Sequence, residues 1–197
     1  MTTCILHGGF TRVRNTLNEG FYAEIASHTK DKGTILYVYF ACENKSVDEI
    51  TERFQEHQGR ILAHAKGKTF THDLATHTEF PVQLEKADTI FINGGNPEKL
   101  MKELHHYPDF AEKLKGKTIA GSSSGAYALS TYYYSVTPVP GVYQGCGVAP
   151  VRLTCHFETE HSSEHYRGEE AIALLDRYPH DLELVVLRDY EWRTITV

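Results

Sequence analysis

The chain has 197 residues, of which 41% are hydrophobic and 23% are charged, a balance typical of a globular domain. Its net charge of −6, without a basic block, argues against nucleic acid or an anionic membrane as the main partner. No apolar run approaches the length of a membrane span, and the first residues lack a signal-peptide pattern. We therefore expect one domain over residues 1–197 and a cytoplasmic location.

Cysteine and histidine usage gives no sign of a disulfide framework or a metal site. The four cysteines are widely spaced, with no Cys-x-x-Cys pair, which favours reduced thiols. The 12 histidines are scattered, and none belongs to a His-Glu-x-x-His motif. We expect no metal and no cofactor.

The first half of the chain alternates strand and helix patterns. Residues 3–6 predict a buried strand that ends at His7-Gly8-Gly9, and residues 16–29 carry apolar side chains at helical spacing. Residues 34–41 are continuously apolar, aromatic or β-branched, which is typical of a parallel strand covered on both faces. Ser46 to Glu49 forms a capping box that opens a second helix.

The second half continues the alternation. Residues 89–92 predict a strand, and Asn96-Pro97-Glu98 is a favourable helix start. A Gly-rich loop is expected at residues 141–150. Further strands are expected at residues 69–74, 117–120, 132–139 (extended), 151–156, 182–187 and 192–197, and further helices at residues 80–86, 110–114, 126–130 and 167–178.

This alternation predicts an α/β fold with a mostly parallel, doubly wound sheet and helices on both faces, a three-layer arrangement. Ligands of such sheets bind outside the carboxyl ends of the strands. Four strand ends carry distinctive residues, and we expect them to converge on one edge. They are His7-Gly-Gly, Asn93-Gly-Gly-Asn, Gly121-Ser-Ser-Ser-Gly and His156-Phe-Glu158.

The most informative stretch is Gly121-Ser122-Ser123-Ser124-Gly125, which joins a short strand to a helix. Gly-x-Ser-x-Gly at such a turn is the nucleophile-elbow pattern. It holds the central hydroxyl, here that of Ser123, at the tip of a tight turn, and the following helix directs its N–H groups there. A Ser/Gly-rich loop without catalytic meaning is the alternative.

A serine nucleophile needs a base, and a histidine base is usually oriented by an acid. His156 is the best base because it ends an apolar strand, whereas His57, His64, His72 and His77 lack such a position. Glu158 is the proposed acid, since residues i and i+2 of an extended segment share a face. Glu160 and Glu164 are nearby substitutes, and each carboxylate could equally be a solvated loop residue.

An oxyanion hole needs two backbone donors directed at the developing charge. The N–H of Ser124, next to the nucleophile, can supply one. Gly94 or Gly95 can supply the other, because glycine permits close backbone approach. The structural alternative for Gly94-Gly95 is a simple strand-to-helix turn.

Three motifs in order resemble the dipeptidase E and cyanophycinase family of serine peptidases. They are Phe91-Ile-Asn-Gly-Gly-Asn96, Ile119-Ala-Gly-Ser-Ser-Ser-Gly-Ala126 and Cys155-His-Phe157. The resemblance implies a flavodoxin-like α/β sandwich, related to class I glutamine amidotransferases, and a hydrolase without a cofactor. It also implies Ser123 as nucleophile, His156 as base, and Gly94, Gly95 and Ser124 as the oxyanion site.

The chain departs from that family where the acid and the specificity pocket are concerned. The segment after the elbow helix, residues 132–138, contains no acid, and Thr154 stands where cyanophycinases tend to have an aspartate. The helix after the histidine lacks the arginines of dipeptidase E, and Arg167 is the nearest cation. We therefore keep Glu158 as the expected acid and Arg167 as the expected substrate-binding cation.

We thus expect a serine peptidase or amidase that acts on a small peptide, with an aspartyl dipeptide, the substrate that the family resemblance implies, and a homodimer kept as options. One alternative is a catalytically silent member of the same fold that binds a ligand. Another is an α/β-hydrolase esterase, suggested by His7-Gly-Gly, which would use Asp176 and His180. A glutamine amidotransferase fails because serine replaces the expected cysteine.

Overall fold

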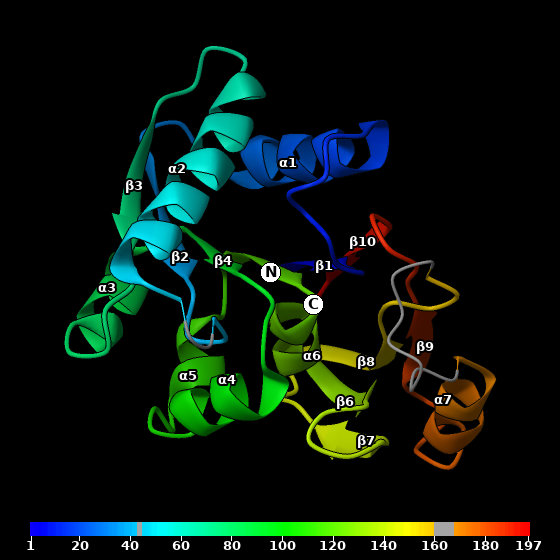
Figure 1. Ribbon diagram of the computed structural model, residues 1–197. Helices are drawn as coiled ribbons and strands as arrows, with labels where there is room; N and C mark the ends of the chain where they lie inside the picture. The colour runs from blue at the N-terminus through cyan, green and yellow to red at the C-terminus, as the bar shows by residue number, and fades with distance from the viewer. Residues whose placement is uncertain (43–44, 160–167) are drawn as a thin grey trace.

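A computed structural model describes residues 1–42, 45–159 and 168–197, and the described strands form two sheets (Figure 1). The strands are β1 (Thr3–His7), β2 (Gly33–Val38), β3 (Phe70–Leu74), β4 (Thr89–Ile92), β5 (Thr118–Ser122), β6 (Ser130–Ser135), β7 (Gly141–Gln144), β8 (Ala149–Thr154), β9 (Glu183–Val186) and β10 (Trp192–Thr196). The helices are α1 (Thr16–His28), α2 (Val47–Ala63), α3 (Phe80–Lys86), α4 (Pro97–Leu104), α5 (Phe110–Lys113), α6 (Ser124–Leu129) and α7 (Gly168–Leu175).

The larger sheet has six strands in the order β10-β1-β5-β4-β2-β3. Its pairs are parallel except for β10, which runs antiparallel to β1. Gly121 on β5 lies opposite Leu6 on β1 and Ile92 on β4, so the carboxyl ends of these three strands are level. The expected α/β fold with a mostly parallel sheet is confirmed.

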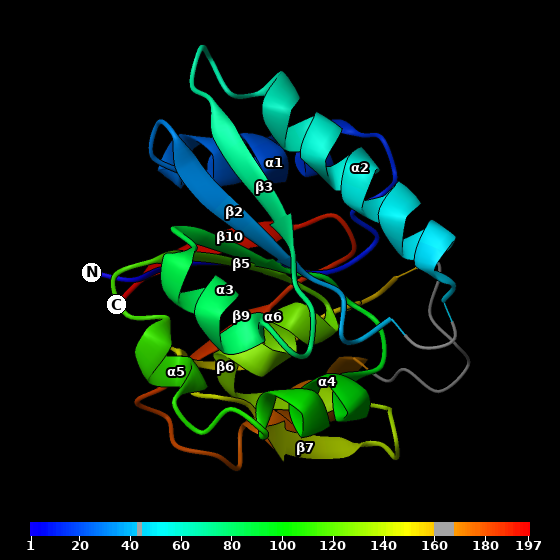
Figure 2. The same cartoon turned by 90° about the vertical axis from the view of Figure 1, so that its left-hand side faces the viewer.

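Helices cover both faces of this sheet because its strands are apolar on both sides. Ile5, Tyr37 and Phe91 pack in a cluster with residues of α1 and α2. Leu6 and Ile92, on the opposite face, pack in a second cluster with residues of α3, α4 and α6. Figure 2 shows α1 and α2 on one side of the sheet and α3 to α6 on the other.

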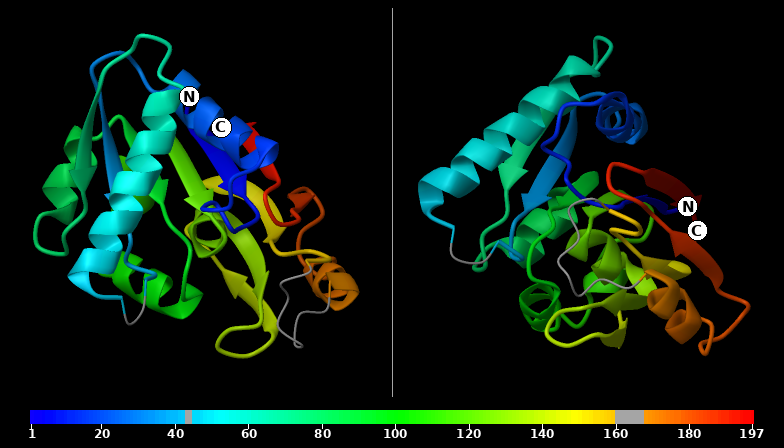
Figure 3. Two further views of the ribbon diagram at one scale, coloured as in Figure 1. Left: turned by 45° about the horizontal axis from the view of Figure 1, so that its top comes forward. Right: turned by 45° about the vertical axis from the view of Figure 1, so that its right-hand side comes forward.

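The smaller sheet, in the order β7-β6-β8-β9, was not anticipated as a separate sheet. Its β7 lies within residues 141–150, for which a loop was predicted, and pairs antiparallel with β6. Leu153 and Val185 of this sheet belong to the apolar cluster that also contains Leu6 and Ile92 of the six-stranded sheet. Figure 3 shows α7 beside β6 to β9, on the opposite side of the molecule from α2 and β3.

The predicted helix starts are confirmed by their hydrogen bonds. The Ser46 hydroxyl accepts from the N–H of Glu49 at 3.2 Å, and the Glu49 carboxylate accepts from the N–H of Ser46 at 2.9 Å. Asn96 caps α4 by accepting from the N–H of Lys99. Caps of this kind are worth about 1 kcal/mol each.

All four cysteines are free thiols. No helix in the described parts of the chain combines the length and the apolar character that crossing a bilayer requires.

Candidate active site

Ser123 stands at a sharp turn between β5 and α6. Its backbone has φ 51° and ψ −113°, a region that residues other than glycine rarely adopt. The N–H of Ser123 donates to the carbonyl of His7 at 2.9 Å, and the carbonyl of Ser123 accepts from Tyr127 in the helix. Strained backbone held in this way is common where a side chain must be presented for chemistry.

The two glycines of the motif are required by close backbone contacts. A Cβ on Gly121 would lie 2.5 Å from the carbonyl carbon of Gly125. A Cβ on Gly125 would lie 2.1 Å from the carbonyl oxygen of Ile92. Any larger residue at either position would push the turn away from the sheet.

His156 reaches the serine from the segment that follows β8. Its Nε2 lies 2.9 Å from Oγ of Ser123, within hydrogen-bond distance. The ring packs on Gly9, where an added Cβ would lie 2.1 Å from Cε1 of the imidazole. The ring of Phe10 meets it edge-on with centroids 5.5 Å apart. These contacts fix the ring beside the nucleophile.

Asp189 completes a chain of hydrogen bonds. Nδ1 of His156 donates to Oδ1 of Asp189 at 2.7 Å, which leaves Nε2 free to accept from the Ser123 hydroxyl. The Asp189 side chain is only 7% exposed. Its second oxygen is buried and has no hydrogen-bond partner in the described part of the chain.

The pairing of β8 with β9 explains why these two residues meet. Thr154, the last residue of β8, lies opposite Val186, the last residue of β9. His156 and Asp189 follow those strand ends by two and three residues. Sequence reasoning missed Asp189, although an acid just past the end of a neighbouring parallel strand was the signal that could have found it.

Glu158, the acid expected from the sequence, is turned toward a different partner. Its carboxylate forms an ion pair with Arg188 at 2.5 Å, and both side chains are more than half exposed. The expectation assumed an extended segment, but His156 and Glu158 have φ of 60° and 49°. The chain therefore bends, and the i, i+2 relationship does not apply. Glu160, Glu164 and Arg167 lie outside the described residues.

Gly94 and Ser124 offer N–H groups beside the nucleophile. A Cβ on Gly94 would lie 3.0 Å from the Cβ of Ser123, so this backbone is in direct contact with the serine. In the described part of the chain, neither N–H has an acceptor. Gly95 differs, because its N–H lies 3.3 Å from the Ser124 hydroxyl, which itself donates to the Gly95 carbonyl at 2.5 Å.

His7 is a buried, neutral residue that supports the site through its hydrogen bonds. Its Nδ1 accepts from the N–H of Gly9 at 3.0 Å, and its Nε2 lies 2.8 Å from Oδ1 of Asn18. Burial lowers the pKa of His7 to about 4. His7 thus connects the turn that supports His156 with the backbone of Ser123.

The predicted convergence of strand ends produces a cleft of about 440 Å³. Three of the four strand ends contribute to its lining, and the rest comes from α2 and from the residues that follow His7-Gly8-Gly9. The lining residues are Phe10, Thr11, Arg12, Arg53, Asn93, Gly94, Gly95, Ser122, Ser123 and His156. Among the described residues, no group of three or more His, Cys, Asp or Glu side chains could hold a metal ion.

The residues of the esterase alternative do not belong to this cleft. Asp176 accepts from the Arg152 guanidinium at 3.1 Å, and His180 is exposed. His156, and not His180, contacts Ser123.

Comparisons with known proteins show which family and which solved structures the chain is similar to. A family model described as Peptidase family S51 matches residues 5–196. A search of curated proteins found no significant match. A peptidase from an acI-B1 Actinobacterium superposes with a TM-score of 0.72 at 19% identity, covering 99% of this chain and 83% of that one. A candidate peptidase E from Listeria monocytogenes EGD-e superposes with a TM-score of 0.67 at 15% identity, covering 99% and 94%.

Proposed function

Because the chain belongs to peptidase family S51, we propose that it hydrolyses a peptide or amide bond of a small peptide through Ser123, His156 and Asp189. The observation that carries the proposal is the unbroken chain of hydrogen bonds, 2.9 Å from Ser123 to His156 and 2.7 Å from His156 to Asp189. A serine hydroxyl is a weak nucleophile until such a base removes its proton.

The first step is attack of Oγ of Ser123 on the scissile carbonyl carbon while Nε2 of His156 takes the hydroxyl proton. The imidazolium that forms is stabilised by the buried carboxylate of Asp189. Nε2 then returns the proton to the leaving amine, the C–N bond breaks, and an acyl-enzyme remains. Water, activated by the same imidazole, hydrolyses the ester and releases Ser123.

The negative charge on the carbonyl oxygen needs donors that are already in place. We assign this role to the N–H groups of Ser124 and Gly94, which flank the nucleophile. Gly95 has a supporting role, since its N–H and its carbonyl are both engaged by the Ser124 hydroxyl. That pair of hydrogen bonds ties the Gly94-Gly95 turn to the elbow.

The size of the cleft favours a short substrate. At about 440 Å³ it falls in the range of pockets that enclose small ligands. The catalytically silent alternative was considered because the sequence offered no clear acid. Asp189 supports the active alternative, because it forms a hydrogen bond with Nδ1 of His156, where the acid of such a site is expected. The observations therefore favour an active peptidase.

Hydrolysis of a dipeptide panel with varied first residues tests the proposal. We expect turnover of at least one dipeptide by the wild type and a loss of about 10³-fold or more in Ser123→Ala. The circular dichroism spectrum of the variant should match that of the wild type. Undiminished turnover in Ser123→Ala would contradict the proposed mechanism.

A further inference from the structure

The backbones of the nucleophile and the base are connected behind the site by a closed ring of hydrogen bonds. The carbonyl of His7 accepts from the N–H of Ser123 at 2.9 Å and from the thiol of Cys155 at 3.8 Å. The N–H of Cys155 donates to the hydroxyl of Tyr127 at 3.3 Å, and the N–H of Tyr127 donates to the carbonyl of Ser123 at 2.9 Å. Cys155 immediately precedes His156, so the ring joins the turn of Ser123 to the segment that carries the base.

This ring of hydrogen bonds lies inside the protein. His7 and Cys155 are fully buried, and Tyr127 is 6% exposed. Burial raises the pKa of the Cys155 thiol, which therefore keeps the proton that it donates to His7. Buried hydrogen bonds of this kind hold their partners firmly, because breaking one leaves a polar group away from water.

The hydroxyl of Tyr127 gives Cys155 the acceptor that a neighbouring strand would otherwise provide. The last register pair of β6 with β8 joins Tyr133 and Leu153, two residues before Cys155. The N–H of Cys155 is buried beyond that point, and a buried N–H requires an acceptor. The next residue, His156, has φ 60°, so the chain turns there. Tyr127 therefore fixes the backbone at the start of the turn that presents the base.

A stack of tyrosine rings holds Tyr127 in place. Its ring centroid lies 4.8 Å from that of Tyr133, with the planes 9° apart, and the centroid of Tyr133 lies 5.7 Å from that of Tyr143. Tyr143 lines the pocket beside α4, and its hydroxyl donates to the carbonyl of Val139 at 2.6 Å. The stack thus runs from a surface pocket to the residue that contacts Cys155.

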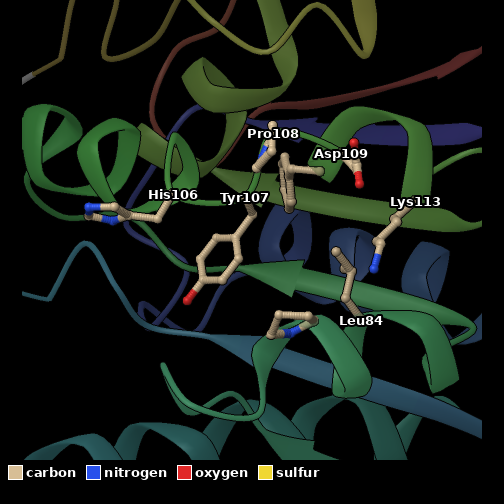
Figure 4. Close-up of a pocket in the computed structure, with 8 residues that line it drawn as sticks. Leu84, His106, Tyr107, Pro108, Asp109 and Lys113 are labelled. Atoms are coloured by element: carbon tan, nitrogen blue, oxygen red, sulfur yellow. The ribbon is translucent and has the colours of Figure 1, made fainter.

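Tyr107 provides a comparison outside this stack. Figure 4 shows it among the residues of another pocket, where its hydroxyl donates to the carbonyl of His77 at 2.9 Å. Tyr107 and Tyr143 therefore each form a hydrogen bond from a hydroxyl to a carbonyl, and neither belongs to the ring of hydrogen bonds behind Ser123.

We propose that Tyr127 is a positioning residue whose hydroxyl holds the backbone at Cys155 and so keeps the ring of His156 within hydrogen-bond distance of Oγ of Ser123. This rests on the proposed function, because the contact that it maintains is the one through which His156 activates Ser123. Tyr127 is not among the described residues that line the cleft, so it acts on the geometry of the base and not on the substrate. Catalysis is sensitive to such geometry, since a misplacement of about 1 Å can cost about 100-fold in rate.

Tyr127→Phe tests the proposal, because it removes the hydroxyl and keeps the ring in its stack. Two rates are measured. One is the second-order rate constant for labelling of Ser123 by a fluorophosphonate, which needs no peptide substrate, and the other is kcat on the best dipeptide. We expect both to fall by about 10- to 100-fold. KM should stay within about threefold of the wild type, because the lining of the cleft is unchanged.

Two tyrosine variants serve as controls. Tyr143→Phe removes a hydroxyl from the same stack, and Tyr107→Phe removes one outside it. Both should keep the labelling rate and kcat within about twofold of the wild type. All four proteins are measured at a temperature at which circular dichroism shows each to be folded, since the unpaired N–H of Cys155 is expected to lower the melting temperature of Tyr127→Phe.

Failure of the inference is distinct from failure of the proposed function. The inference is overturned if Tyr127→Phe melts earlier but keeps the labelling rate and kcat of the wild type, since the hydroxyl then serves the fold alone. It is also overturned if KM rises while kcat is unchanged, or if the controls lose as much rate as Tyr127→Phe. The proposed function fails if the wild type is labelled but hydrolyses no dipeptide, and the labelling rates then still decide the inference.

Discussion

Oδ1 of Asp189 lies 2.7 Å from Nδ1 of His156, although the two residues are 33 positions apart in the chain. The contact exists because β8 and β9 end level with each other in the smaller sheet. It sets the tautomer of His156 in which Nε2 can accept the proton of Ser123. The role of His156 as the base depends on this contact.

Asp189→Asn should lower kcat by roughly 10³- to 10⁴-fold with little change in stability, because an amide favours the wrong tautomer of His156 and leaves the imidazolium uncompensated. Steady-state kinetics on the best dipeptide measures this. Glu158→Gln is the matched control, since Glu158 is exposed and bound to Arg188, and its kcat should stay within about threefold of the wild type. A larger loss in Glu158→Gln than in Asp189→Asn would show that the acid has been misassigned.

Gly125→Ala should destabilise the fold by about 1–3 kcal/mol and reduce activity, because its Cβ would collide with the carbonyl of Ile92. Gly59→Ala is the control. Gly59 is an exposed residue inside α2, and a Cβ there would meet nothing within 4 Å. That change should stabilise the protein by about 1 kcal/mol and leave activity unchanged. Urea unfolding measures the free energy of unfolding of both variants. Equal effects of the two substitutions would show that the turn at Ser123 does not require a glycine at position 125.

The buried histidines should make the protein less stable as the pH falls from 6.5 to 5. Burial lowers the pKa of His7 to about 4 and that of His57 to about 3, whereas an unfolded histidine titrates near 6.5. Within this window the unfolded state binds more protons than the folded state, so the free energy of unfolding rises with pH. The slope is about 1 kcal/mol per pH unit for each histidine.

Urea unfolding at pH 6.5 and 5 measures the slope, and NMR titration of the ring signals identifies the groups. The signals of His7 and His57 should not titrate above pH 5. Titration of either ring near pH 6.5 would contradict their assignment as buried neutral residues.

Local patterns were sufficient for several parts of the site. Gly121 and Gly125 predicted the turn at Ser123 because close backbone contacts there exclude a Cβ. The end of an apolar strand predicted that His156 reaches the nucleophile, and the two residues are 2.9 Å apart. Each of these features depends on residues close together in the chain or on the common edge of a parallel sheet.

Contacts between residues far apart in the chain could not be predicted from the sequence patterns. Asp189 depends on the pairing of β8 with β9 in a second sheet, and that sheet was not foreseen. Glu158 was favoured by assuming extended backbone, whereas His156 has φ 60°. β7 lies in a Gly-rich stretch that reads as a loop, yet it pairs with the tyrosines of β6.

The central claim is that Ser123 is an activated nucleophile, and labelling with a fluorophosphonate tests it most directly. Such a reagent reacts with a serine only where a base and an oxyanion site act on it. We predict one label per chain, located on Ser123 by mass spectrometry and absent after denaturation or in Ser123→Ala. A folded protein that takes up no label, or takes it up at another residue, would contradict the account.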